Sequence, residues 1–220
     1  MMMPIHSARE EILRNARAAL RRRVDSPVAP IPSSARVAPR LAGDANSEIE
    51  MLLGEIAKLG GNTRRIAQRI EFNQALEQLV QMEQIKKATV WQTTELLELG
   101  IEESLRGLGI EIISPHSDKY ALAQCDLGVT SVDGALPETG TLILRSSSER
   151  PRMVSLVPRA HLAIMRSSAL RADIAPALVG LQGEGYWVFV TGPSRTADIE
   201  LTVTIGVHGP KALHVWNWEG

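Results

Sequence analysis

Cysteine is almost absent from this chain, and its scarcity excludes several kinds of site. The 220 residues contain one cysteine, Cys125. A single thiol cannot form a disulfide framework, a cysteine-based zinc site or an iron–sulfur cluster. The His-x-x-x-His and His-Glu-x-x-His spacings are also missing, so we expect neither a metal site nor a cofactor held by this chain. Because no nearby histidine could activate Cys125, we interpret it as a buried structural thiol rather than a nucleophile.

Aromatic residues, excess charge and long apolar runs are scarce as well. The chain has two Phe and two Tyr, and its formal net charge is −1. Without a stacking platform or a basic field, nucleic acid is not an expected partner. The longest apolar run, residues 187–190, is far shorter than the roughly 18 residues of a membrane span. The first residues also lack the apolar segment of a secretory signal, so we expect a cytoplasmic protein without a membrane span.

The first 46 residues differ in pattern from the rest. Apolar residues at four-residue spacing predict an amphipathic helix over about residues 5–24. These residues are Ile12, Ala16, Leu20 and Val24. Six arginines make the helix basic, so it either docks on an acidic partner surface or is a solvated helix. Four prolines in residues 25–46 predict an extended linker, which leaves a compact body at 47–220.

The body alternates between helix and strand patterns. Helices are predicted at residues 47–59 (with Ser47 as cap), 73–87, 94–107, 119–125 and 172–181. Strands are predicted at residues 63–70, 88–92, 109–114, 127–132, 141–145, 153–157, 162–165, 186–191, 202–205 and 212–218. This alternation favours an α/β fold with a mainly parallel sheet and helices on both faces. The apolar run at 186–191 predicts a central strand that is buried on both faces.

One polar, glycine-containing segment follows that apolar strand, at residues 191–198. Gly192 and Pro193 turn the chain, and free N–H groups, hydroxyls and a guanidinium then converge, as they do around a bound phosphate, carboxylate or other anion. The candidate anion-binding residues are Ser194, Arg195, Thr196 and Asp198. The alternative is a capped turn in which Arg195 pairs with Asp198 or Glu200.

A second such segment occupies residues 137–141. Gly140 would let the backbone approach a ligand, Thr141 would line the same site, and Glu138 is a candidate base or nucleophile. The alternative is a Glu138 that is merely solvated in a turn. Because parallel strands place their carboxyl ends at one sheet edge, we predict that both segments share one pocket.

Two histidines are candidates for the same pocket. His161 enters a predicted strand, and His208 lies between Val207 and a Gly-Pro turn. Either could act as a general acid, a general base or a ligand. The alternative for each is a packing or hydrogen-bonding role at a strand edge.

Five of these segments, in this order, resemble the LUD domain of the lactate utilization protein C family. They are Asp-Leu-Gly-Val-Thr at 126–130, Glu-Thr-Gly-Thr-Leu at 138–142, Ser-Leu-Val-Pro-Arg-Ala-His-Leu at 155–162, Thr-Gly-Pro-Ser-Arg-Thr-Ala-Asp-Ile-Glu at 191–200 and Gly-Val-His-Gly-Pro at 206–210. The resemblance implies a fold like that of the NagB/RpiA/CoA-transferase proteins. It also implies a role in oxidising lactate to pyruvate with two iron–sulfur partner proteins, which would carry the redox centres.

The resemblance assigns no catalytic residues, so three roles stay open. The chain could be an interaction subunit with a pocket for a small-molecule anion. It could be a stand-alone enzyme, either an acyl-CoA transferase, with Glu138 two residues before Gly140, or an ATP-dependent ligase. It could also be a non-catalytic scaffold that forms a homo-oligomer. A Gly-x-Gly-Gly loop and a basic nucleotide loop are both missing, which weighs against the two enzymes. The final tryptophans, Trp216 and Trp218, belong either to a buried strand or to a contact surface.

Overall fold

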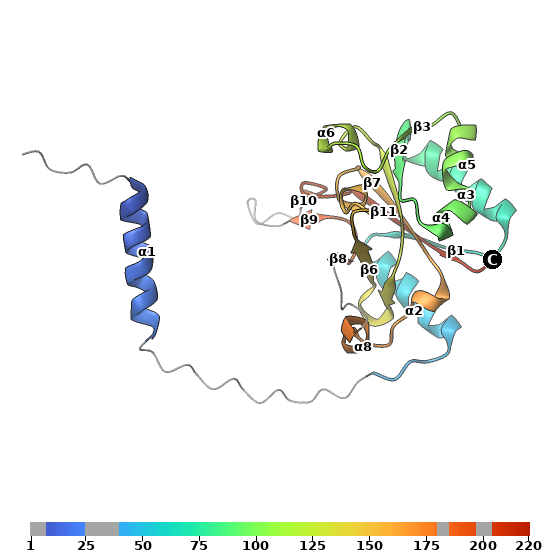
Figure 1. Ribbon diagram of the computed structural model, residues 1–220. Helices are drawn as coiled ribbons and strands as arrows, with labels where there is room; N and C mark the ends of the chain where they lie inside the picture. Colours follow the sequence, from blue (N-terminus) through green and yellow to red (C-terminus); the bar gives the residue numbers. More distant parts are fainter. Residues whose placement is uncertain (1–7, 25–39, 180–184, 197–203) are drawn as a thin grey trace, which may run out of the picture. The chain divides into compact units, whose positions relative to one another are not determined.

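The computed structural model describes residues 8–24, 40–179, 185–196 and 204–220, in two units, residues 1–38 and residues 39–220 (Figure 1). In the first unit the described element is helix α1 (Ala8–Val24), where the basic amphipathic helix is predicted. Its apolar residues Ile12 and Leu20 are both about two-thirds exposed. Most of the predicted linker lies outside the described residues. None of the helices in the described ranges has the length and apolarity needed to cross a membrane.

A six-stranded sheet forms the centre of the second unit, and all its neighbouring strands are parallel. In spatial order its strands are β1 (Asn62–Ile66), β11 (Ala212–Trp218), β7 (Ala160–Met165), β4 (Leu127–Ser131), β2 (Lys87–Val90) and β3 (Glu111–Ile113). The predicted mainly parallel sheet is therefore confirmed. β11 lies inside the sheet, between β1 and β7, and Trp216 and Trp218 are buried.

Helices cover both faces of this sheet. The helices described in this unit are α2 (Ala45–Lys58), α3 (Arg69–Met82), α4 (Thr94–Glu98), α5 (Ile101–Gly107), α6 (Lys119–Leu122), α7 (Met153–Leu156) and α8 (Ile174–Val179), with short 3-10 turns at Pro137–Thr139 and Ser167–Ala169. Of these, α8 packs against the second sheet described below, through Ala177. α3 covers one face, where the Phe72 ring packs edge-on against two tryptophans. The distances between ring centres are 5.4 Å to Trp216 and 5.7 Å to Trp218. α7 covers the other face, where a Cβ on Gly128 of β4 would lie 1.8 Å from the carbonyl oxygen of Val154.

A second, three-stranded sheet is antiparallel. Its order is β5 (Gly134–Leu136), β6 (Thr141–Ser146) and β8 (Tyr186–Val190), so β8 lies at an edge. Tyr186 and Phe189 are 67% and 43% exposed. The prediction of a central strand here was wrong, because an apolar run does not distinguish a strand buried on both faces from an edge strand with apolar surface. β9 (Arg195–Thr196) and β10 (Thr204–Ile205) form a further antiparallel pair.

Several local predictions are corrected by the structure. The strand predicted at 153–157 is helix α7, and the helix predicted at 94–107 is broken at Gly100, whose φ is +52°. The cap of α2 is Asp44 rather than Ser47. The Asp44 carboxylate accepts hydrogen bonds from the N–H and the hydroxyl of Ser47, at 3.1 and 2.6 Å.

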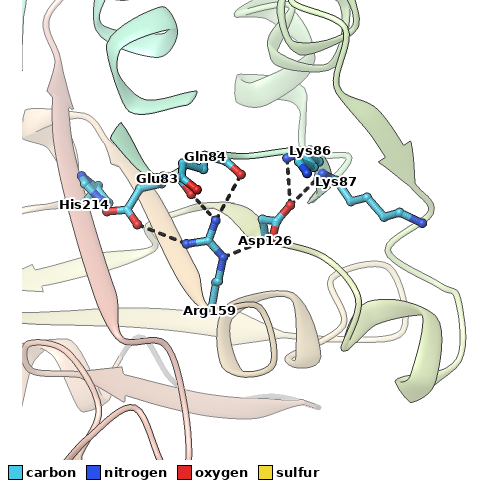
Figure 2. A network of polar contacts seen from close by, with 7 residues as sticks. All are labelled: Glu83, Gln84, Lys86, Lys87, Asp126, Arg159 and His214. Atoms are coloured by element: carbon cyan, nitrogen blue, oxygen red, sulfur yellow. Dashed lines mark hydrogen bonds and ion pairs between the residues drawn. The ribbon is translucent and has the colours of Figure 1, made fainter. Parts of the chain in front are cut away.

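A polar network ties together the amino ends of the parallel strands (Figure 2). Arg159, directly before β7, donates from Nε to Asp126 at 3.1 Å and from Nη2 to the Glu83 carbonyl oxygen. Asp126, directly before β4, also accepts from the N–H groups of Lys86 and Lys87 at 2.8 and 3.0 Å. Burial raises the pKa of Asp126, but these N–H groups and Arg159 outweigh it and lower the pKa overall. Asp126 and Arg159 belong to the first and third family motifs, so part of these motifs has the structural role of joining the strand ends.

Candidate functional site

A cavity of about 360 Å³ lies between the end of β8 and the turn that precedes β11. We call it the Arg195 cavity. Four of the predicted site residues line it, namely His161, Ser194, Arg195 and His208. The structure therefore brings together one predicted anion-binding segment and both candidate histidines.

The loop between β8 and β9 is held in place from two sides. Gly192 has a φ of +83°, and a Cβ there would lie 3.1 Å from the Cβ of Leu59 at the end of α2. Ser194 donates its N–H to the Pro210 carbonyl at 3.0 Å, and its own carbonyl accepts from the Gly206 N–H at 2.9 Å. This loop is therefore held by α2 and by the turn before β11.

Arg195 is exposed and lies across the carboxyl end of α2. A Cβ on Gly60 would be 3.1 Å from Arg195 Nη2. The negative end of the α2 dipole favours a cation at this place. Within the described ranges no carboxylate forms an ion pair with Arg195, while Asp198 and Glu200, its alternative partners, lie outside those ranges. Thr196 pairs with Thr204 in the β9–β10 ladder and is not among the residues that line the cavity.

His161 is a buried polar residue in the lining of the cavity. It is 1% exposed, and its Nε2 lies 2.9 Å from the Thr130 hydroxyl. Burial, aided by the charge of His214, lowers the pKa of His161 to about 3. The imidazole is therefore neutral at physiological pH and suits hydrogen bonding better than acid catalysis. His214 lies on the opposite face of the sheet, where its Nε2 is 3.0 Å from Glu83 Oε1.

His208 is the exposed imidazole of the site, in the turn before β11. Ser155 of α7 also lines the cavity, and the sequence reasoning missed it. Its hydroxyl donates to the Arg152 carbonyl at 2.9 Å. Ser155 is the first residue of the third family motif, and this motif was the sequence signal that could have identified it. The strand predicted at residues 153–157 gave no indication that this side chain lines the cavity.

Glu138 and Thr141 line a different cavity, of about 480 Å³, which we call the Glu138 cavity. It adjoins the Arg195 cavity, because Phe189 and Thr191 line both. The Thr141 hydroxyl lies 2.8 Å from that of Thr139 and 2.8 Å from that of Thr191. A chain of hydroxyls therefore links the two predicted segments.

The two segments are close for a reason other than the predicted one. Thr141 begins β6 and Thr191 follows β8, and these strands are antiparallel neighbours. His161 lies near the start of β7, so the Arg195 cavity is at the amino end of the parallel strands, not at their carboxyl end.

Gly140 has a structural role, because it packs closely against helix α2. Its φ is +61°, and a Cβ there would lie 2.9 Å from the Ile56 nitrogen in α2. Gly140 lines neither cavity. The close backbone approach predicted for it is made to a helix.

Cys125 has the surroundings of a structural thiol. Cys125 is 3% exposed, and burial, with a smaller contribution from Asp126, raises its pKa to about 11. A buried thiol with this pKa is a weak nucleophile, as the structural interpretation requires. The described ranges contain no group of three or more His, Cys, Asp or Glu side chains arranged to hold a metal ion.

These features define an α/β domain with a parallel sheet, an antiparallel side sheet and a basic cavity between them. The family model of the LUD domain matches residues 49–216, most of the chain. Lactate utilization protein C of Shouchella clausii (strain KSM-K16) is 33% identical over 156 residues, which cover 66% of this chain and 68% of that protein. The chain therefore belongs to the LUD domain family and resembles its lactate utilization protein C members.

Other known proteins are similar to this chain. Lactate utilization protein C of Halalkalibacterium halodurans is 29% identical over 151 residues, covering 63% of this chain and 65% of that protein. An uncharacterized protein of Neisseria meningitidis serogroup B is 40% identical over 93 residues, 40% of each chain. The crystal structure of a DUF162 family protein from Deinococcus radiodurans matches with a TM-score of 0.59 and 19% identity, over 80% of this chain and 99% of that one. That last likeness supports the fold alone.

Proposed function

We propose that this chain is a cytoplasmic component of an L-lactate utilization system, in which lactate is oxidised to pyruvate together with iron–sulfur partner proteins. Its membership of the LUD domain family and its similarity to lactate utilization protein C support the proposal. The redox centres would lie in the partners, because one buried cysteine cannot ligate a cluster.

Within this role we propose that the Arg195 cavity binds a small carboxylate such as lactate or pyruvate. The observation that carries this proposal is an exposed guanidinium in a cavity whose described lining contains no carboxylate. A carboxylate there would meet Arg195, the Ser194 hydroxyl and His208. A charge-assisted hydrogen bond of this kind contributes about 1.5–3 kcal/mol.

Growth on L-lactate tests the proposal. A strain that lacks the gene should fail to grow on L-lactate as sole carbon source, and the intact gene should restore growth. Arg195→Ala should restore it poorly although the protein folds, because an exposed side chain at the start of the two-residue strand β9 adds little stability. Arg106→Ala on α5, an exposed arginine away from both cavities, is the matched control and should grow like the wild type.

Two further readouts separate the parts of this proposal. Lactate or pyruvate should bind the purified wild-type chain in calorimetry, and more weakly the Arg195→Ala variant. Stoichiometric iron should appear in complexes co-purified from the native host and not in the isolated chain. Normal growth of the deletion strain on lactate would rule out the proposed role in lactate utilization.

A further inference from the structure

Another cavity, of about 220 Å³, lies on the face of the parallel sheet that α3 covers. We call it the His214 pocket. Residues of β1, α3 and β11 line it, and none of them lines the Arg195 cavity or the Glu138 cavity. In the parallel pairing of β1 with β11, Asn62 lies opposite His214 and Arg64 lies opposite Trp216. These four side chains alternate along their strands, so they share one face of the sheet and one pocket.

His214 brings a hydrogen-bond acceptor to this pocket. Its side chain is buried, and Nε2 lies 3.0 Å from Oε1 of Glu83, which stands between His214 and Arg159 (Figure 2). Burial, with a smaller contribution from Arg64, lowers the pKa of His214, so the ring is neutral at pH 7. Because a carboxylate only accepts hydrogen bonds, Nε2 carries the proton and Nδ1 keeps a lone pair. Nδ1 makes no hydrogen bond within the described ranges, so it can accept one from a molecule in the pocket.

Arg64 brings a positive charge to the same pocket. Its guanidinium is exposed and donates from Nη2 to the amide oxygen of Gln78 at 2.8 Å, which is a neutral partner. Arg64 forms no ion pair within the described ranges, and no carboxylate is among the described residues that line the pocket. The acid nearby, Glu83, has its own cation, because Oε2 lies 3.5 Å from Arg159 Nη1. The charge of Arg64 is therefore available to an anion, and its planar guanidinium suits a carboxylate.

The rest of the lining is largely apolar and leaves little room. Leu79 and Met82 of α3 and Trp216 of β11 contribute most of it. At roughly 30 Å³ for each water-sized group, the pocket holds a molecule of about six or seven non-hydrogen atoms. The occupant should therefore be small, with an anionic end, a hydrogen-bond donor beside it and a short apolar group.

We propose that the His214 pocket binds a small 2-hydroxycarboxylate and discriminates against the corresponding 2-ketocarboxylate. The carboxylate would bind Arg64, the hydroxyl would donate to His214 Nδ1, and the apolar group would contact α3. A keto oxygen is an acceptor and would face the lone pair of Nδ1, which leaves both groups without a donor. Glu83 is a positioning residue, because it decides which ring nitrogen carries the proton. The inference goes beyond the proposed function, which assigns a carboxylate of either kind to the Arg195 cavity.

Methyl NMR of the full-length protein tests this inference, because Met82 lines the pocket. With isotope-labelled methionine methyl groups, L-lactate should shift the Met82 signal saturably. The signal of Met51, which lines neither this pocket nor the Arg195 cavity, should stay in place. Pyruvate should need at least about a tenfold higher concentration for the same shift. A Met82 signal that ignores lactate, or that responds equally to both acids, would overturn the inference.

Arg64→Gln tests the anionic end of the ligand. The variant should bind lactate at the Met82 position at least about tenfold more weakly, because one charge-assisted contact is lost. Arg65→Gln is the matched control. Arg65 is the next residue of β1, but its guanidinium binds Asn46 and Glu219 and does not line the pocket, so the control should keep the wild-type affinity. Unchanged affinity in Arg64→Gln would contradict the proposed site.

Glu83→Gln tests the hydroxyl end with a readout other than stability. Arg159 should keep the amide oxygen of the new side chain on its own side, so the amide nitrogen faces His214 and donates to Nε2. His214 would then carry its proton on Nδ1 and donate to a keto oxygen. The preference for lactate over pyruvate, as a ratio of dissociation constants, should fall at least about tenfold. A merely structural Glu83 would change both affinities alike, and an unchanged ratio would overturn the inference.

Two comparisons separate this pocket from the proposed function. The lactate-dependent Met82 shift should persist in Arg195→Ala, because the two cavities share no lining residue, and its loss there would overturn the inference. Lactate binding at Met82 together with normal growth of the deletion strain on lactate supports the pocket and overturns the proposed function. A growth defect without any Met82 shift supports the proposed function and overturns the pocket.

Discussion

The neutral imidazole of His161 makes folding depend on pH. Its pKa in the folded state is about 3, against an ordinary value of 6.5. Between these values the unfolded chain binds a proton that the folded chain rejects, so stability is complete above about pH 6.5 and falls as the pH is lowered. From pH 7 to pH 5 this one group removes up to about 2 kcal/mol from the free energy of unfolding.

The His161→Gln variant tests that dependence. Urea unfolding at pH 7 and pH 5 should show a smaller loss of stability in the variant than in the wild type. Part of the loss should remain, because burial also lowers the pKa of His214. His116→Gln, at an exposed site, is the control and should keep the wild-type loss. Identical losses in His161→Gln and wild type would mean that the folded protein accepts the proton.

Cys125 should be inert in the folded protein. The thiol is buried and its pKa is about 11, so almost no thiolate exists at pH 8. We expect less than stoichiometric reaction with Ellman's reagent over an hour in buffer and one equivalent in denaturant. Rapid native reaction would show that the segment around α6 opens on that timescale.

At the scale of elements, two glycines should respond in opposite ways to alanine. In Gly128→Ala the new methyl group would collide with the carbonyl of Val154, so β4 and α7 must separate at a cost of about 1–3 kcal/mol. Gly54 lies inside α2, and apart from its chain neighbours and the helix backbone no atom lies within 4 Å of the added methyl group. Gly54→Ala should therefore stabilise by about 0.5–1 kcal/mol through helix propensity. Thermal melts of both variants measure the contrast, and equal shifts would contradict the packing described for α7.

The sequence predicted the elements that have strong periodicity and missed those decided by tertiary contacts. The strands of the parallel sheet and the helices α2 and α3 follow from local pattern, with shifts of a few residues at their ends. α7 has four residues, too few to show a period, and its β-branched Val154 favoured a strand. β8 was predicted to be a central strand because an apolar sequence does not indicate whether a strand lies against a helix, another strand or solvent.

The candidate site was predictable in part, for a related reason. The family motifs supplied four candidate residues that do line one cavity, namely His161, Ser194, Arg195 and His208. The way in which the Glu138 segment approaches them, through Thr141 and Thr191, was not predictable, because it follows from the antiparallel pairing of β6 with β8. No local sequence signal specifies that pairing.

At the scale of the whole molecule, limited proteolysis should respect the division into two units. We expect the first cuts within residues 25–46, where prolines and small residues predict an extended chain, and a resistant fragment that contains the body. Mass spectrometry of a trypsin time course measures this. Early cuts inside β4, β7 or β11 would contradict a body built on one central sheet.

The interior position of β11 has a consequence for synthesis of the chain. β1 pairs only with β11 in the described sheet, and Asn62 lies opposite His214, about 150 residues further along. At roughly 5–20 residues per second, a nascent β1 waits on the order of 10–30 s for its partner to leave the ribosome. During that interval Phe72 and the neighbouring face of α3 lack the tryptophans they pack against. The nascent chain therefore exposes apolar surface, to which a ribosome-associated chaperone would bind until β11 has been synthesised.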